Sequence, residues 1–165
     1  MSDVLVKRVV KKRKTTQPGL TLSEIKRSHS DQEKKRCSVL ITEEMKRGMS
    51  FSVVDEGFGM RGKSAWVANA IIEFLGAQLP HVSQPWKVMV IQTEVYFKNK
   101  KGVRETFQID EVDWIRAWRA AIDTALFGAT LEDPVYMEIS VSSVIRSAIS
   151  WKLGLAKDAP RGAAS

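Results

Sequence analysis

RCSVLIT (36–42) and RETFQID (104–110) are two short stretches of the chain that share one pattern, 68 positions apart. In each stretch the side chains alternate with a period of two, as they do along a strand that buries one face. Each stretch ends at a residue that favours the N-terminus of a helix, Thr42 or Asp110. The sequence therefore predicts the same strand and the same helix start twice.

Each predicted strand leads into a first helix, then a glycine-containing break and a second, closing helix. The helix after Thr42 is the less distinct one, because SFSVV (50–54) also fits a strand, whereas the helix after Asp110 continues to about Phe127. One strand-helix-helix unit cannot bury its own apolar faces, but two such units can pack against each other.

The closing helices are SAWVANAIIEFLG (64–76) and SSVIRSAISWKLG (142–154), and they align without gaps. We expect Ser64 to cap the first of them, and the second to begin near Ser140. The identical positions are Ser64/Ser142, Ala70/Ala148, Ile71/Ile149, Leu75/Leu153 and Gly76/Gly154.

The segment between the two units has no counterpart elsewhere in the chain. Trp86–Phe97 is rich in β-branched and aromatic residues, which predicts a strand. The polar Lys98–Gly102 fits a hairpin turn from that strand into the second ribbon strand. A third strand paired beside the ribbon would widen it, so we expect an extra strand or hairpin that bends away from the ribbon or packs elsewhere.

Aromatic and apolar residues at helical spacing are expected to pack in the core. Trp66 and Trp151 lie on the closing helices, and Cys37 lies at an inward strand position, where it would be an inert buried thiol. The helix after Asp110 carries Trp114, and its expected buried stripe consists of Ile115, Trp118, Ile122 and Leu126.

These elements predict an α+β fold that is mostly helical, with two units in a pseudo-dimeric arrangement around a two-stranded antiparallel ribbon. The flanking stretches 1–34 and 155–165 are predicted to be disordered, because they lack a sustained apolar period. The single globular domain between them, 35–154, would consist of unit one (36–76), a linker with the extra strand (77–103) and unit two (104–154).

Composition narrows the class of protein. The 165 residues carry a net charge of +7, and residues 1–35 hold ten Lys/Arg against four Asp/Glu. VKRVVKKRK (6–14) lacks the apolar core of a signal peptide, and no apolar run approaches the roughly 20 residues of a membrane span. The single cysteine excludes an internal disulfide. We expect a cytoplasmic protein with a basic arm and no membrane partner.

The sequence gives no reason to expect catalysis. His29 and His81 have no ligand partners at metal-binding spacing, and no nucleophile stands in a recognisable pattern with a base. We therefore expect no enzyme activity, no cofactor and no metal ion.

A nucleotide-binding alternative comes from GFGMRGKS (57–64), which satisfies the Walker A pattern. In that interpretation SFSVV (50–54) is the preceding strand, Lys63 reaches the phosphates and Ser64 holds Mg²⁺. The pattern lacks a good Walker B aspartate, because the only candidate is Glu94, which Gln92 and Thr93 separate from the apolar run. The same GKS sequence also suits a helix N-terminus that holds a phosphate of DNA.

A two-stranded antiparallel ribbon fits the major groove of B-DNA, where outward side chains meet base edges. Arginine bonds guanine, glutamine bonds adenine, and serine or threonine adapts to either. An ordinary sheet also exposes polar residues to water, so the pattern alone does not establish a contact. The candidate base-contacting residues are Arg36, Ser38, Leu40, Arg104, Thr106 and Gln108, among which only Leu40 is apolar.

The second closing helix lacks a lysine that corresponds to Lys63 of the first, so the two helix ends would not hold phosphates equally. Basic residues of the N-terminal arm would add phosphate contacts without reading sequence. The candidate phosphate-contacting residues are Gly62, Lys63, Ser64, Ser142 and Ser143 at the helix ends, and Lys11, Lys12, Arg13 and Lys14 in the arm.

The strand, the helix cap, the glycine-containing break and SAWVANAIIEFLG (64–76) together resemble the ribbon-helix-helix (Arc/MetJ-type) DNA-binding superfamily. The likeness covers about 36–76 and, more faintly, 104–154. Most members are homodimers of short chains. Two units in one chain resemble the accessory proteins encoded in virC operons of Ti plasmids, which bind DNA at the transfer origin.

The resemblance implies that the polar outward residues Arg36, Ser38, Arg104, Thr106 and Gln108 read bases, and that the helix ends Gly62–Ser64 and Ser142–Ser143 hold phosphates. It implies a monomer that acts as a pseudo-dimer on double-stranded DNA, as a relaxosome accessory factor in conjugative or T-DNA transfer. A relaxase or another DNA-processing protein would be a further partner. A transcriptional repressor of the same fold is the alternative.

Overall fold

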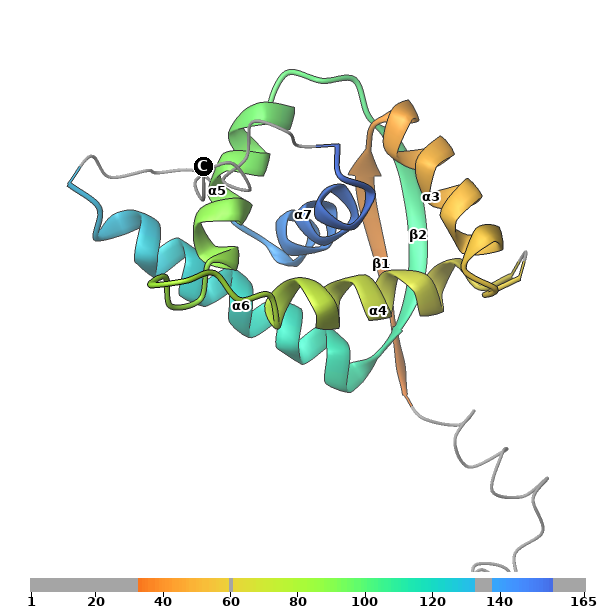
Figure 1. Ribbon diagram of the computed structural model, residues 1–165, viewed down its shortest axis with the longest axis horizontal. Helices are drawn as coiled ribbons and strands as arrows, with labels where there is room; N and C mark the ends of the chain where they lie inside the picture. Colours follow the sequence, from red (N-terminus) through yellow and green to blue (C-terminus); the bar gives the residue numbers. More distant parts are fainter. Residues whose placement is uncertain (1–32, 60, 133–137, 156–165) are drawn as a thin grey trace, which may run out of the picture. The chain divides into compact units, whose positions relative to one another are not determined.

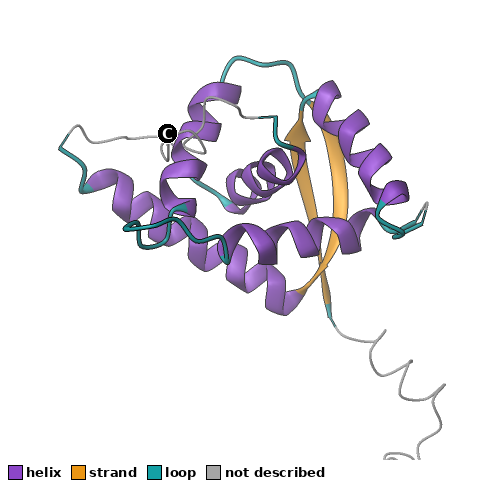
Figure 2. Ribbon diagram, viewed as in Figure 1, coloured by secondary structure: helices purple, strands orange, loops and turns teal. Residues whose placement is uncertain are grey.

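Two strands and five helices follow one another in the part of the chain that the computed structural model describes, residues 33–59, 61–132 and 138–155. Figure 1 shows their arrangement, and Figure 2 shows the two strands of the ribbon beside a remainder of helices and loops. The elements are β1 (Lys34–Ile41), α3 (Glu43–Asp55), α4 (Lys63–Leu75), α5 (Trp86–Phe97), β2 (Val103–Asp110), α6 (Glu111–Ala129) and α7 (Val141–Leu153).

The two strands form an antiparallel ribbon, as predicted. Ser38 lies opposite Thr106, the residue 68 positions further along the chain, and this separation equals the offset between the two sequence patterns. The pairing is therefore symmetric: within 35–41 and 103–109, replacing each residue by its counterpart 68 positions away in the other strand gives the same set of pairs. The flanking pairs are Arg36 with Gln108 and Leu40 with Arg104.

The boundaries of the two closing helices repeat as well. α4 and α7 have 13 residues each, and the gap-free alignment of the two closing helices matches their first and last residues. The stretch 50–54, which also fitted a strand, belongs to α3. Thr42 caps α3 as predicted, because its side-chain oxygen accepts a hydrogen bond from the Met45 N–H at 3.1 Å.

Two other expected caps differ in the structure. α4 begins at Lys63 with Gly62 in the N-cap position, so Ser64 lies inside the helix and does not cap it. Its hydroxyl instead accepts a hydrogen bond from the ribbon. Asp110 occupies the N-cap position of α6, but its side chain makes no capping hydrogen bond among the described residues.

One face of the ribbon is buried beneath the helices. Alternate side chains of both strands are inaccessible to solvent, and the β1 side chains contact α7 while those of β2 contact α4. This burial follows from the period of two, because every second residue points to the same face. The buried strand residues are Cys37, Val39, Ile41, Phe107 and Ile109.

The predicted extra strand, Trp86–Phe97, is wrong, because this segment is the helix α5. Its buried residues include Trp86, Met89, Val90 and Thr93, which recur at the three- and four-residue spacing of a helix face. α5 packs against α6 and α7. This packing outweighs the strand preference of the β-branched residues, so Lys98–Gly102 connects a helix to β2 and is not a hairpin turn.

The buried face of α6 also differs from the prediction. Of the expected stripe, Trp118 is 46%, Ile122 41% and Leu126 63% exposed, so these side chains do not pack in the core. Trp66, in contrast, is fully buried as expected. Small residues allow α6 to lie close to its neighbours, and the larger apolar side chains are left at the surface: the buried positions are Ala117, Ala120, Ala121, Thr124 and Gly128.

The described domain extends slightly beyond the predicted bounds. β1 already begins at Lys34, and the Leu155 N–H donates a hydrogen bond to the carbonyl of Ser150. Residues 1–32 and 156–165, which contain most of the two predicted disordered stretches, lie outside the described residues. Among the helices of the described ranges, none combines the length and the apolarity that crossing a membrane requires.

Candidate nucleic-acid interface

The structure brings the six candidate base-contacting residues together on the uncovered face of the ribbon. Five of them are exposed and Thr106 is half-buried. Across the centre of this face, the Arg104 Nη1 donates a hydrogen bond to the Ser38 hydroxyl at 3.0 Å. Leu40 is 45% exposed and places an apolar side chain opposite Arg104. The face is therefore polar and cationic except at the Leu40 position.

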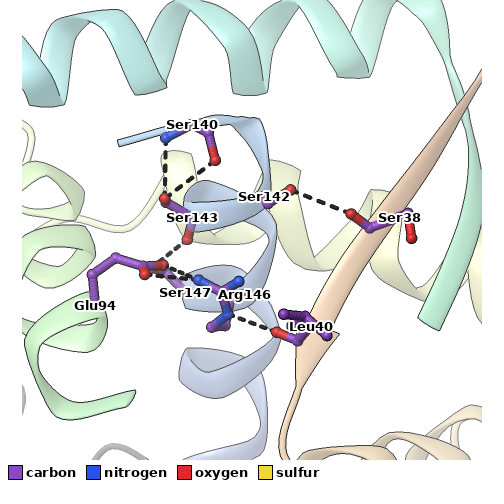
Figure 3. Close-up of polar contacts among 8 residues, drawn as sticks. All are labelled: Ser38, Leu40, Glu94, Ser140, Ser142, Ser143, Arg146 and Ser147. Carbon is purple, nitrogen blue, oxygen red and sulfur yellow. Dashed lines mark hydrogen bonds and ion pairs between the residues drawn. The ribbon is translucent and has the colours of Figure 1, made fainter. Parts of the chain in front are cut away.

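The N-termini of the two closing helices lie against the two edges of the ribbon. At α4, the Ser64 hydroxyl accepts a hydrogen bond from the backbone N–H of Gln108 in β2 at 3.0 Å. At α7, the Ser142 hydroxyl donates to the backbone carbonyl of Ser38 in β1 at 3.4 Å (Figure 3). Both serines thus join a helix start to a strand, and each strand has one helix start beside it.

Lys63 at the start of α4 is held by an ion pair that the sequence analysis did not foresee. Its ammonium lies 2.6 Å from the Glu105 carboxylate, and Lys46 lies 3.5 Å from the other oxygen of the same group. The hydrogen bond from Lys63 lowers the pKa of Glu105 below its ordinary value, although burial opposes this shift. The inward position of Glu105 in the period-two pattern was the signal that it needs a cationic partner.

The glycines of the 57–64 segment have backbone roles of their own. Gly57 and Gly59 have φ values of +83° and +76°, which favour glycine. A side chain at Gly62 would collide with the carbonyl oxygen of Phe58. Because α3 precedes this segment, the strand that a phosphate-binding loop requires is not there. The Walker A interpretation therefore loses its structural context.

Ser143 is turned into the molecule. Its side chain is buried, and its hydroxyl oxygen accepts a hydrogen bond from the Ser140 N–H at 3.0 Å (Figure 3). The Ser143 hydroxyl is thus engaged at the start of α7 and does not face solvent. At this helix end, Ser142 is the candidate whose side chain reaches the surface.

Arg146 is a residue that the sequence analysis missed. Its Nε donates to the carbonyl of Leu40 at 2.7 Å, and its Nη1 lies 2.5 and 2.7 Å from the two oxygens of Glu94 (Figure 3). Burial raises the pKa of Glu94, and the Arg146 guanidinium opposes this shift. Arg146 therefore ties α7 to both α5 and the edge of β1. Glu94 has this structural role in place of the one considered in a Walker B motif.

Lys11, Lys12, Arg13 and Lys14 lie outside the described residues. Within the described ranges, no group of three or more His, Cys, Asp or Glu side chains could hold a metal ion.

Comparison with protein-family models, curated proteins and solved structures finds no match to the chain.

Proposed function

We propose that the chain is a ribbon-helix-helix protein with both units in one polypeptide, and that it binds duplex DNA without catalysis. The observation that carries the proposal is the register of the ribbon, in which Ser38 lies opposite its own counterpart Thr106. A symmetric ribbon of this kind presents one continuous outward face, as a groove-reading ribbon requires. The position of one closing-helix start beside each strand supports the same conclusion.

In the proposed complex the ribbon enters the major groove with its uncovered face towards the bases. Arg36 and Arg104 would bond guanine, Gln108 would bond adenine, and Ser38 and Thr106 would adapt to the local base. Because Arg104 already donates to Ser38, binding would exchange this bond for a bond to a base edge. Leu40 would contact a thymine methyl group.

The starts of α4 and α7 would hold backbone phosphates on either side of the groove. Backbone amides and the helix dipole favour an anion at such a position. At α4, Lys63 would turn from Glu105 towards the phosphate, and Gly62 and Ser64 would flank it. At α7, Val141 stands in the place of Lys63, which leaves Ser142 without a neighbouring lysine. The two halves would therefore hold the duplex unequally, and the preferred site would not be a strict palindrome.

The biological role that we propose is that of an accessory factor in conjugative or T-DNA transfer. Its support is the sequence resemblance, and a relaxase would be the partner. Relaxase nicking of origin DNA, measured with and without this chain, tests the role. If the chain leaves nicking unchanged but represses a reporter placed behind the promoter of its own gene, its role is that of a transcriptional repressor.

DNA binding is tested by fluorescence anisotropy on a random-sequence duplex at several salt concentrations. The intact chain is compared with the triple variant Arg104→Ala/Thr106→Ala/Gln108→Ala. The matched control is Arg119→Ala/Thr130→Ala/Gln92→Ala, which removes the same three residue types from exposed positions outside the ribbon, two in helices and one at the C-cap of α6. A further chain lacks residues 1–32 and so keeps β1 complete.

We expect salt-dependent binding that the ribbon variant weakens and the control variant does not. Removal of residues 1–32 should weaken binding and reduce its salt dependence. If binding disappears with residues 1–32 and is insensitive to the ribbon variant, the ribbon is not the reader. If the intact chain binds no duplex at low salt, the proposed function is wrong.

A further inference from the structure

The loop between α5 and β2 carries three lysines. It lies near β1, the strand whose neighbouring helix start, at α7, has Val141 in place of a lysine. Lys98, Lys100 and Lys101 are all exposed, and none of them forms an ion pair with an acidic side chain of the described residues. Lys63, in contrast, is paired with Glu105 at 2.6 Å. The three lysines are thus available cations on an otherwise nearly neutral domain.

The loop approaches the ribbon closely at one residue. A Cβ atom placed on Gly102 would lie 3.2 Å from the Leu40 Cβ and 3.4 Å from the Ile41 carbonyl oxygen. Gly102 directly precedes Val103, which pairs with Ile41, so the loop passes the C-terminal end of β1 beside the outward residue Leu40.

A pocket of about 180 Å³ lies between the loop and the ribbon. Water takes up about 30 Å³ per molecule in the liquid, so the pocket has room for a phosphate group with part of its hydration. Arg146 and Glu94 also line it, and their charges compensate each other. The excess charge is therefore that of the lysines: the loop residues at the pocket are Lys98, Lys100, Lys101 and Gly102.

We propose that Lys98, Lys100 and Lys101 form an additional contact site for a phosphate of the DNA backbone beside the C-terminal end of β1. The site supplies cations to the half of the interface in which Val141 replaces a lysine and Leu40 replaces a polar reader. The proposal rests on the proposed DNA-binding function. It extends that function to a loop that lies between the two repeated units and belongs to neither of them.

The test is the dependence of duplex affinity on salt concentration. Each phosphate contact contributes about 0.9 to the slope of log K against log salt. The variant is Lys98→Gln/Lys101→Gln, which leaves Lys100 and its contact with the Tyr96 ring in place. The control is Arg116→Gln/Arg119→Gln on α6, which removes the same total charge from a helix whose exposed face is not part of the ribbon.

We expect the loop variant to reduce the slope by roughly 1 to 2, and to weaken random and selected duplexes alike. The control should leave the slope unchanged. An unchanged slope in the loop variant, or an equal decrease in the control, would overturn the proposal while the binding of the intact chain still stands. If inorganic pyrophosphate competes with DNA only when the loop lysines are present, and the slope is unaffected, the pocket binds free phosphate instead. Absence of duplex binding by the intact chain would overturn both proposals.

Discussion

α4 and α7 are equivalent helices of the two units, but α4 has a face exposed to solvent whereas the corresponding face of α7 is buried. On α4 the positions Ala65, Asn69 and Ile72 are exposed. The aligned positions of α7 are Ser143, Ser147 and Ser150, and all three are buried. α5 packs against α7, and Glu94 of α5 forms an ion pair with Arg146 of α7. The two copies of the closing helix thus have different environments, and the buried positions of α7 that correspond to exposed positions of α4 carry small hydroxyl residues.

The largest expected effect concerns this difference in burial. Ser147→Leu would force three additional carbon atoms into a position with no accessible surface and remove the hydrogen bond from its hydroxyl to the Ser143 carbonyl. Overpacking of this kind typically costs about 1–3 kcal/mol, and we expect the upper end. The measurement is the free energy of unfolding in urea.

The aligned position of α4 provides the matched control. Asn69→Leu places the same side chain on an exposed helix face, where substitutions usually change stability by less than about 0.5 kcal/mol. If the two variants lose equal stability, α5 is not what distinguishes the two helices. Far-UV circular dichroism of both variants verifies that the helices are retained.

A smaller effect is expected at Glu105, where the two units also differ. Its counterpart in β1 at the 68-residue offset is Cys37, so only β2 carries an inward carboxylate. Glu105→Gln should lower the free energy of unfolding by about 1.5 kcal/mol at pH 7, a value reduced because both lysine partners are more than one-third exposed.

The contribution of Glu105 to the free energy of unfolding should depend on pH. The pKa of Glu105 is lowered in the folded protein, so the ionised carboxylate stabilises the fold above its ordinary pKa of 4.5. The contribution decreases as the pH falls through the lowered pKa. The stabilities of the wild type and Glu105→Gln should therefore converge below about pH 4.5 in urea titrations. A difference that stays constant down to pH 3 would assign the effect to packing.

The sequence predicted those features that depend on the repeat. The alternation in 36–42 and 104–110 predicted the ribbon and its outward residues. The shared positions of 64–76 and 142–154 predicted two helices of equal length. These predictions succeed because a period of two and a helical period each place side chains on a definite face, and two independent copies support the same interpretation.

The features outside the repeat could not be predicted in the same way. Trp86–Phe97 has residues of high strand propensity, but its helical form depends on the surfaces of α6 and α7, which a local pattern does not contain. The large apolar residues of α6 suggested a buried stripe, whereas its small residues form the contact. The Lys63–Glu105 and Arg146–Glu94 pairs join residues 42 and 52 positions apart, so no local spacing indicates them.

The smallest expected effect concerns the two outward triplets of the ribbon, Arg36-Ser38-Leu40 and Arg104-Thr106-Gln108. Leu40→Gln would make them nearly identical, because Leu40 and Gln108 are counterparts at the 68-residue offset. Since Leu40 is 45% exposed, its replacement should change stability by less than about 0.5 kcal/mol. Under the proposed function, the new side chain can bond an adenine, with a gain of roughly 1 kcal/mol or less on a matching site.

Selection of binding sites from a random duplex library measures this change. The wild type should select sites whose two halves differ, whereas Leu40→Gln should select sites closer to a palindrome. The reverse change, Gln108→Leu, also makes the triplets alike but removes a polar contact, so it should select more symmetric sites with lower affinity. If both variants retain the asymmetric preference of the wild type, the difference between the halves comes from the loop lysines and the helix ends, and the side chains at these two positions do not read bases.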